Sequence, residues 1–480
     1  MKKNVLFGLA LVCSAFLSNV MAAEVKKDSA VYTPRGANGE LTLTSKWLYS
    51  NKLNNYNVAA DLIAPAATAR GMAVKDGKML FIDRTNKQIV VVNGTTGAKE
   101  TPIALNQTMF TYQGRNKANT ADSTYTAGLW GYQDIKVDNA GNVLVGNIIT
   151  SNSGRFQVWK VDMATGNGTI VIDQANLATL YPAATTMRFD AFGVWGDVTS
   201  NAVIMAANAS AMEVYKWTIT NGVASAPSLI ELDNSATTGA DLAGLTNLGS
   251  APQVFPLDDN YFYVDGNATF PVLCDKEGNV IDGFKSKLAN LKDSVTVPGT
   301  TWTMVQGQNG VKEFEIGGKY FIVMAASNTD KTPPSAFRLF QFADAGKAFS
   351  GLTCLWTFPQ AGMGTMSNSY RTAMPCVEVS GNVARIYVYI GENGYGMYEL
   401  KVSQTGIDEL VNNNAVQVTI DGRTMNLSET VASVKVYSLA GQLISRNANV
   451  SSVSVENSGI YIVKALTVNG ETAIHKVVVK

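Results

Sequence analysis

A repeat of about sixty residues runs through most of this chain and limits the folds that it can adopt. In each copy an apolar residue closes a first strand-like segment, and a turn and a second apolar run follow. The closing residues are evenly spaced along the sequence: Val74, Val137, Val198, Leu257, Ile316 and Val379. A fixed period of this length indicates supersecondary units that stack on one another.

The first copy shows what one unit contains. Residues 71–74, 79–82, 89–92 and 101–105 read as four strands, and Asp76-Gly77 is a turn dipeptide that tolerates positive φ at both positions. The second and third strands are apolar without alternation, so both of their faces should be covered. Neighbouring copies can provide this cover. We therefore predict an all-β fold with a six-bladed β-propeller, with seven blades as the alternative.

The two ends of the propeller, which should occupy residues 43–404, are expected to meet. The sixth unit reaches only a third strand, at 396–402, before the composition changes. Residues 43–49 around Trp47 resemble residues 352–358 around Trp356, the fourth strand of the fifth unit. The N-terminal strand should therefore complete the last blade, which removes sheet edges that would otherwise aggregate. An extended linker at residues 43–52 is the alternative.

Residues 1–23 have the pattern of a signal peptide. Lys2 and Lys3 precede an apolar run at 5–17, and cleavage is expected after Ala22 or Ala23. The run is shorter than the roughly 20 residues that a membrane-spanning helix needs. We expect an exported protein with a linker at 24–42 and no transmembrane segment in the mature chain.

The charges argue against nucleic acid as a partner. Lys and Arg together number 38, as do Asp and Glu, and no basic cluster stands out. Neutralisation of phosphates supplies most of the affinity for nucleic acids, so a chain with no net charge and no basic cluster is a poor candidate.

Cysteine and histidine restrict the chemistry further. Cys13 lies in the signal peptide, and lipidation there is disfavoured because the preceding residues are not small. Cys274, Cys354 and Cys376 remain after export; Cys354 and Cys376 could form a bridge, or all three could be buried thiols. The single histidine, His475, lies outside the repeats, so no histidine-dependent triad or histidine metal site is expected in the propeller. We expect no cofactor and no metal; 138–142 and 275–279 read as hairpin turns rather than calcium loops.

Aromatic and arginine residues gather ahead of the first strands of several units, where a propeller has one mouth of its central channel. Flat rings cover sugar faces and guanidinium groups bind carboxylates, so this pattern suits a glycan, above all an anionic one. The alternative is that the rings pack between blades and the arginines pair with neighbouring carboxylates. The candidate ligand-binding residues are Arg70, Trp130, Tyr132, Arg188, Trp195, Trp302 and Arg371.

Residues 405–480 read as a separate small domain. A polar connector at 405–414 is followed by strand patterns at 416–420, 434–444 and 458–465 and by a terminal run at 475–480. We predict a small immunoglobulin-like β-sandwich.

The last three of these segments, in this order, resemble the carboxy-terminal sorting domain of cargo for the bacterial type IX secretion system. The motif residues are Tyr437, Gly441, Gly459, Tyr461, Lys476 and Lys480. The resemblance implies recognition by the type IX secretion machinery, passage across the outer membrane, and attachment to the cell surface or release. An ordinary immunoglobulin-like accessory domain is the alternative. The propeller resembles those of secreted bacterial proteins grouped under a domain of unknown function, which implies no chemistry.

These observations favour an exported, surface-attached or secreted β-propeller that binds a glycan or peptide. The alternatives are a histidine-independent carbohydrate-active enzyme, either a lyase or a glycosidase, and a structural component of a surface layer or adhesin. Without histidine, such an enzyme would depend on carboxylates or tyrosine, and a pair of carboxylates distant in the sequence cannot be identified from the sequence.

Overall fold

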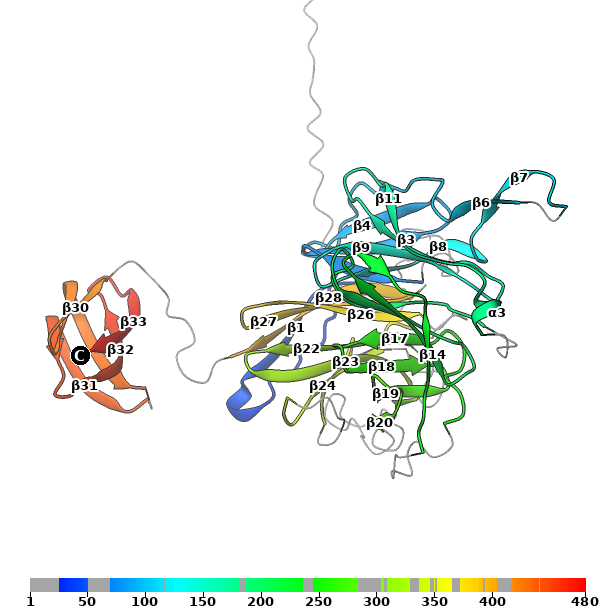
Figure 1. Cartoon of the computed structure of the whole chain (residues 1–480). Coiled ribbons are helices and arrows are strands. Elements are labelled where there is room, and N and C mark those ends of the chain that lie inside the picture. Colours follow the sequence, from blue (N-terminus) through cyan, green and yellow to red (C-terminus); the bar gives the residue numbers. More distant parts are fainter. Residues whose placement is uncertain are drawn as a thin grey trace, which may run out of the picture.

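The structure is a computed structural model. It describes residues 26–50, 70–115, 118–181, 187–235, 245–283, 304–305, 309–328, 336–345, 349, 352–364, 372–391, 393–403, 416–439 and 441–480. The described part is nearly all β and contains many small antiparallel sheets, so the all-β class predicted from the sequence is confirmed (Figure 1). Its helices are two single turns, η1 (Ala37–Gly39) and α3 (Leu177–Leu180). No helix among the described residues is long and apolar enough to cross a membrane.

Six sheets of four or five strands, numbered here in chain order, follow one another in the described residues between 41 and 402. The first three contain β2 (Met72–Lys75), β3 (Lys78–Asp83), β4 (Gln88–Asn93) and β5 (Ile103–Ala104); β8 (Trp130–Val137), β9 (Val143–Ile148), β10 (Phe156–Val161) and β11 (Gly168–Gln174); and β12 (Gly193–Gly196), β13 (Ala202–Ala207), β14 (Glu213–Thr220), β15 (Val223–Ala224) and β16 (Ser228–Glu231). The hairpin of β6 (Thr111–Arg115) and β7 (Asp122–Thr126) lies between sheets 1 and 2 in the sequence and extends away from the sheets (Figure 1).

The other three sheets continue this pattern. They contain β17 (Gln253–Pro256), β18 (Tyr261–Gly266), β19 (Thr269–Asp275) and β20 (Val280–Gly283); β21 (Met304–Val305), β22 (Val311–Ile316), β23 (Lys319–Asn328), β24 (Ala336–Gln341) and β25 (Thr353–Phe358); and β26 (Ala373–Ser380), β27 (Val383–Ile390), β28 (Gly394–Val402) and β1 (Leu41–Ser50).

Each copy of the repeat builds one of these sheets. Five of the six closing positions lie within a first strand or one residue after it, and Val198 follows β12 by two residues. In sheet 1, Asp76 and Gly77 have φ values of 51° and 71°, as the Asp-Gly hairpin signal predicts. The apolar second strands, such as β3 and β13, are buried almost throughout because side chains cover both of their faces.

The N-terminal strand completes the last sheet, as predicted. Strand β1 pairs antiparallel with β28, from Leu41 opposite Val402 to Ser50 opposite Gly394. It begins two residues earlier than the expected segment at 43–49. The linker alternative for residues 43–50 is therefore wrong; residues 51–52 of that alternative lie outside the described residues.

The residues before β1 were expected to form a linker at 24–42, but the described ones, from residue 26, pack against sheets 5 and 6. Tyr32 is buried, and its hydroxyl donates to Asp28, which also accepts a hydrogen bond of 3.2 Å from Tyr398. The Trp356 indole donates to the Thr33 carbonyl at 3.1 Å. Burial raises the pKa of both tyrosines well above the ordinary range, so they remain neutral donors. The segment before β1 therefore covers the seam, that is, the interface between sheets 5 and 6.

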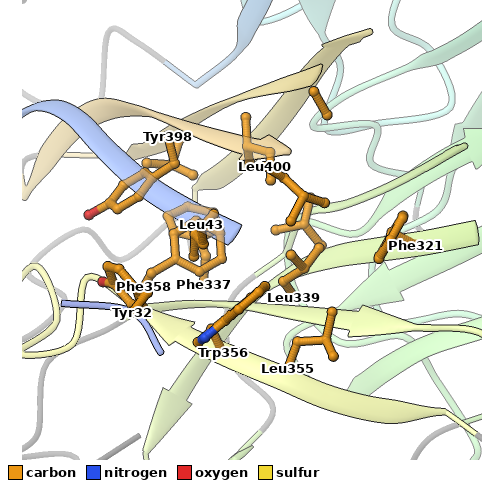
Figure 2. Close-up of a cluster of buried hydrophobic side chains, with 14 of the residues drawn as sticks. Tyr32, Leu43, Phe321, Phe337, Leu339, Leu355, Trp356, Phe358, Tyr398 and Leu400 are labelled. Atoms are coloured by element: carbon orange, nitrogen blue, oxygen red, sulfur yellow. The ribbon is translucent and has the colours of Figure 1, made fainter. Parts of the chain in front are cut away.

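A large apolar cluster fills that seam. Figure 2 shows it between sheet 5 and the paired strands β28 and β1 of sheet 6. Its labelled members are Tyr32, Leu43, Phe321, Phe337, Leu339, Leu355, Trp356, Phe358, Tyr398 and Leu400, all of them buried. Residues 26–403 are called the large region below. The first and last parts of this region therefore share one apolar core.

The C-terminal residues form a sheet of their own with a separate apolar core. Its strands are β29 (Val418–Asp421), β30 (Thr424–Ser438), β31 (Leu443–Ser454), β32 (Gly459–Leu466) and β33 (Thr472–Val479). Gly441, with φ of 79°, forms the turn between the long strands β30 and β31, as the Gly-containing motif predicts. The first half of β30 pairs with β29 and the second half with β32, so all five strands belong to one hydrogen-bonded sheet.

Candidate functional site

The first strands of all six sheets surround one cavity of about 280 Å³. One lining residue from each strand is Val74 of β2, Lys136 of β8, Val194 of β12, Phe255 of β17, Glu313 of β22 and Cys376 of β26. Strands that are far apart in the sequence therefore share a central space, as expected for sheets arranged around an axis.

Two charged side chains at this cavity, those of Lys136 and Glu313, have partners within the protein. Lys136 Nζ lies 2.8 Å from Asp134 Oδ1, and Glu313 accepts a hydrogen bond of 2.9 Å from the Tyr263 hydroxyl. Burial raises the pKa of the Cys376 thiol to about 11, so it is a poor nucleophile at neutral pH. Cys274, Cys354 and Cys376 form no disulfide among the described residues, so the structure does not contain the bridge considered above between Cys354 and Cys376.

Two arginines converge on one buried carboxylate at the starting ends of the first strands. Arg70, just before β2, donates to Asp190 Oδ1 over 2.5 Å, and both side chains are only 3% exposed. Arg188 also donates to Asp190, through Nε at 2.6 Å and a terminal nitrogen at 2.7 Å, but its side chain is 39% exposed. The Asp190 carboxylate therefore holds Arg188 in place at the surface.

Trp130 extends this group into sheet 2. The Arg84 guanidinium lies 4.5 Å from the centre of the Trp130 ring, and the Arg70 guanidinium lies 5.8 Å from it, both in the range of a cation–π contact. Arg84 also donates to Gln133 Oε1 at 3.0 Å. We call Arg70, Arg84, Trp130, Gln133, Arg188 and Asp190 the arginine–tryptophan cluster; sheets 1 and 2 and the segment before β12 contribute its residues.

Three of the seven predicted ligand-binding residues, Arg70, Trp130 and Arg188, meet in this cluster. Arg84, Gln133 and Asp190 also belong to the cluster, although no sequence pattern pointed to them. A topological signal could have identified Arg84: it follows the second strand of sheet 1, and that strand ends where the first begins because the two are antiparallel.

The other predicted residues lie elsewhere. Tyr132 is buried; its hydroxyl donates to the Asn106 carbonyl at 2.7 Å and its ring packs edge-on against Phe110, so it supports the fold. Trp195 lies near the far end of β12, opposite Val203, where β13 begins, and is not brought to the cluster. Trp302 and Arg371 lie outside the described residues, as do Ala22 and Ala23.

A second hollow of about 270 Å³ is connected to the cluster through the chain, because one of its lining residues directly precedes Trp130. Leu129, the neighbour of Trp130, is 46% exposed and lines it, together with the hydroxyl residues Thr150, Ser151 and Ser153. At its other side, Tyr112 stacks on Tyr125 with ring centres 5.4 Å apart, and Arg155 lies 4.3 Å from the Tyr112 ring. We call this hollow the hairpin cleft, because β6 and β7 carry the two tyrosines.

The chain matches no family model, and no curated protein matches it. Among solved structures it is similar to a protein of the DUF4623 family from Bacteroides eggerthii, with 12% identity, 78% of each chain covered and a TM-score of 0.47. It is also similar to a PQQ-bound aldose sugar dehydrogenase from Streptomyces coelicolor (9% identity, 75% of this chain and 98% of that chain, TM-score 0.35). A third similar structure is the dihydro-heme d1 dehydrogenase NirN (12% identity, 79% and 74%, TM-score 0.33).

Proposed function

We propose that residues 26–403 form a six-bladed β-propeller that binds an anionic glycan outside the cell. Six repeats that build six sheets support the blade count, and a cavity lined by all six first strands supports their arrangement around an axis. The pairing of β1 with β28 supports closure of the last blade by the N-terminal strand.

The arginine–tryptophan cluster is the observation that carries the proposed binding. It contains three guanidinium groups, two of which, those of Arg70 and Arg188, share the Asp190 carboxylate. Guanidinium groups bind carboxylates with paired hydrogen bonds, and an indole face covers the apolar face of a sugar ring. Asp190 orients Arg188 for this purpose before any ligand arrives, which lowers the entropic cost of binding.

The hairpin cleft suggests the path along which an extended ligand would bind. An oligosaccharide seated on Trp130 would pass Leu129 and reach the hydroxyls of the cleft and the stacked pair of Tyr112 and Tyr125. Hydroxyl groups and aromatic faces suit neutral sugar units, whereas the arginines suit a uronic acid or another acidic unit. We therefore infer an oligomeric ligand with at least one carboxylate rather than a single sugar.

In this proposal the C-terminal residues act as the targeting signal of the protein. We propose that residues 405–480 are an immunoglobulin-like sorting domain for type IX secretion and that the signal peptide directs the first export step. The motif residue Tyr437 lies one residue before the end of β30, and Gly441 lies in the turn that follows this strand. Gly459 is the first residue of β32. A compact sheet with its own core suits a domain that another protein must recognise independently of the cargo.

Binding can be tested with glycan arrays and calorimetry on residues 26–403. We expect acidic oligosaccharides to bind, and Trp130→Ala or Arg188→Ala to raise Kd at least about tenfold, because each removes a contact worth roughly 1.4 kcal/mol or more. Trp195→Ala and Arg385→Ala are matched controls outside the cluster and should leave Kd unchanged. Affinity should fall as salt rises, because a charged contact at the surface is screened.

Two outcomes would contradict this function. Equal binding by Trp130→Ala and Trp195→Ala would move the site away from the cluster. Release of products from a polysaccharide would favour the alternative of a carbohydrate-active enzyme, so each binding oligosaccharide should be examined for cleavage after long incubation.

A further inference from the structure

A second group of buried polar side chains lies where sheets 4 and 5 begin, away from the arginine–tryptophan cluster in the sequence. Gln253 starts β17, Asp265 stands directly opposite it on β18, and Asn309 precedes β22. Their exposures are 6%, 1% and 0%. Three polar residues at this depth need hydrogen-bond or charge partners to be stable in the folded protein.

The three side chains gather around the same two backbone segments. Gln253 Nε2 donates to the Asn309 carbonyl at 3.1 Å, and the next amide, Gly310 N–H, donates to Asp265 Oδ2 at 3.1 Å. Asn309 Nδ2 in turn donates to the carbonyls of Ala251 and, at 3.4 Å, of Ser250, just ahead of Gln253. The group therefore joins the start of sheet 4 to the start of sheet 5.

One oxygen of each side chain is left over. Gln253 Oε1, Asp265 Oδ1 and Asn309 Oδ1 are buried and have no hydrogen-bond partner in the part of the chain that the structure describes. All three atoms are acceptors. Each amide nitrogen already donates to a backbone carbonyl, so turning either amide over to satisfy its oxygen would give up these hydrogen bonds.

The charge of Asp265 is also uncompensated among the described residues. Its side chain is 1% exposed, and it accepts a hydrogen bond from the Gly310 backbone N–H but has no cationic side chain beside it among the described residues. Asp190 is buried to a similar extent but is held by two arginines. Among the described residues, the Asp190 carboxylate is thus neutralised by arginine side chains, whereas the Asp265 carboxylate has no such partner.

We propose that Gln253, Asp265 and Asn309 bind a hard metal cation through these three oxygens. Carboxylate and amide oxygens are the ligands that Ca²⁺ and similar ions prefer. A proton on Asp265 Oδ1 would supply one donor for the two amide oxygens and leave one of them without a partner, whereas a cation bound by all three oxygens also balances the charge. One carboxylate neutralises Na⁺ fully and Ca²⁺ in part, so the two ions are the arms of the test. The bound ion would fasten β17 to the segment before β22.

The experiment uses the mature chain, residues 24–480, stripped with a chelator and dialysed into a Tris buffer free of metal ions. Metal content by elemental analysis and the thermal midpoint are then measured after addition of Ca²⁺, Na⁺ or K⁺, with choline chloride matching the ionic strength. We expect about one ion per chain and a midpoint that rises by several degrees with one of these ions. Asp259→Asn, an exposed carboxylate in the same sheet, is the matched control and should behave like the wild type.

Asp265→Asn should lose both the bound ion and the cation-dependent shift. If that variant does not fold, the metal content and midpoint of the wild type still decide the question. Gln253→Glu offers a further arm, because a second carboxylate should tighten Ca²⁺ binding and make folding depend on it. Absence of bound metal together with an unchanged wild-type midpoint would overturn the proposal. So would an Asp265→Asn variant as stable as the wild type, which would indicate a protonated carboxyl.

Discussion

At the scale of single residues, substitutions at two glycines in turns of sheet 1 distinguish the cost of backbone strain from the cost of a packing clash. Gly77 and Gly97 have nearly equal φ values, 71° and 72°. A Cβ at Gly77 would meet nothing within 4 Å, whereas at Gly97 it would lie 2.8 Å from the Trp47 and Tyr49 rings. Gly77→Ala should therefore cost about 1–2 kcal/mol for the left-handed backbone. Gly97→Ala should cost roughly 1–3 kcal/mol more, because Trp47 is fully buried.

Thermal or denaturant unfolding of the two variants checks this difference. Gly97→Ala should have clearly the lower midpoint. Equal midpoints would mean that the Trp47 ring moves freely, which would contradict the tight contact between β1 and sheet 1 made by the Trp47 indole and the Gly94 carbonyl at 2.7 Å.

Residue types in the sequence predicted part of the candidate site, and the residues that they misplaced or did not indicate have a physical explanation. Arg70 and Trp130 stand immediately before or at the start of first strands, so the repeat places them at one end of the sheets. Trp195 was misplaced because residues 190–192 precede β12 without strand structure, and the strand itself is short, which leaves Trp195 near its far end. Asp265 gave no signal, since nothing in a sequence shows that a carboxylate lacks a countercharge.

At the scale of elements, β1 should be indispensable for the stability of residues 26–403. It buries Leu41, Trp47 and Leu48 completely and Leu43 almost completely. At about 1.5–3 kcal/mol for each large side chain, its removal would cost roughly 6–12 kcal/mol, comparable to the whole stability of a typical domain. A chain that begins at Arg70 should therefore be unfolded or aggregated at room temperature.

Complementation makes this test specific. A synthetic peptide of residues 26–50, added to the chain that begins at Arg70 during refolding, should restore a cooperative unfolding transition. The same peptide with Trp47→Ala and Leu43→Ala should fail. An unchanged unfolding midpoint without β1 would contradict the role assigned to this strand.

The repeat period predicted the existence and order of most strands because each strand is set by local apolar runs and turns. The packing of residues 26–40 could not be predicted in this way. Tyr32 and Asp28 are held by Gln360 and Tyr398, which lie near the opposite end of the large region in the sequence. A polar segment with few apolar residues resembles a linker until such distant partners are known.

At the scale of the whole molecule, the C-terminal sheet and the large region should be separable. Each has its own core: the apolar cluster of the C-terminal sheet includes Val434, Val463 and Val477 and no residue before Val416. Truncation after Gln404 should leave the unfolding midpoint and the glycan affinity of the large region unchanged while abolishing delivery to the cell surface. Cell fractionation should locate the truncated protein in the periplasm, and normal amounts on the surface would contradict the sorting role.

The ladder between β1 and β28 also sets an order in time. Strand β1 leaves the ribosome before any other strand of the large region, and β28 leaves last, so five complete sheets are synthesised between Ser50 and Gly394. At synthesis rates of about 5–20 residues per second, β1 must wait roughly 17–70 seconds for its partner. A chain that ends before β28 therefore cannot complete its last sheet, and only chains that extend to Val402 can form the whole ladder between β1 and β28.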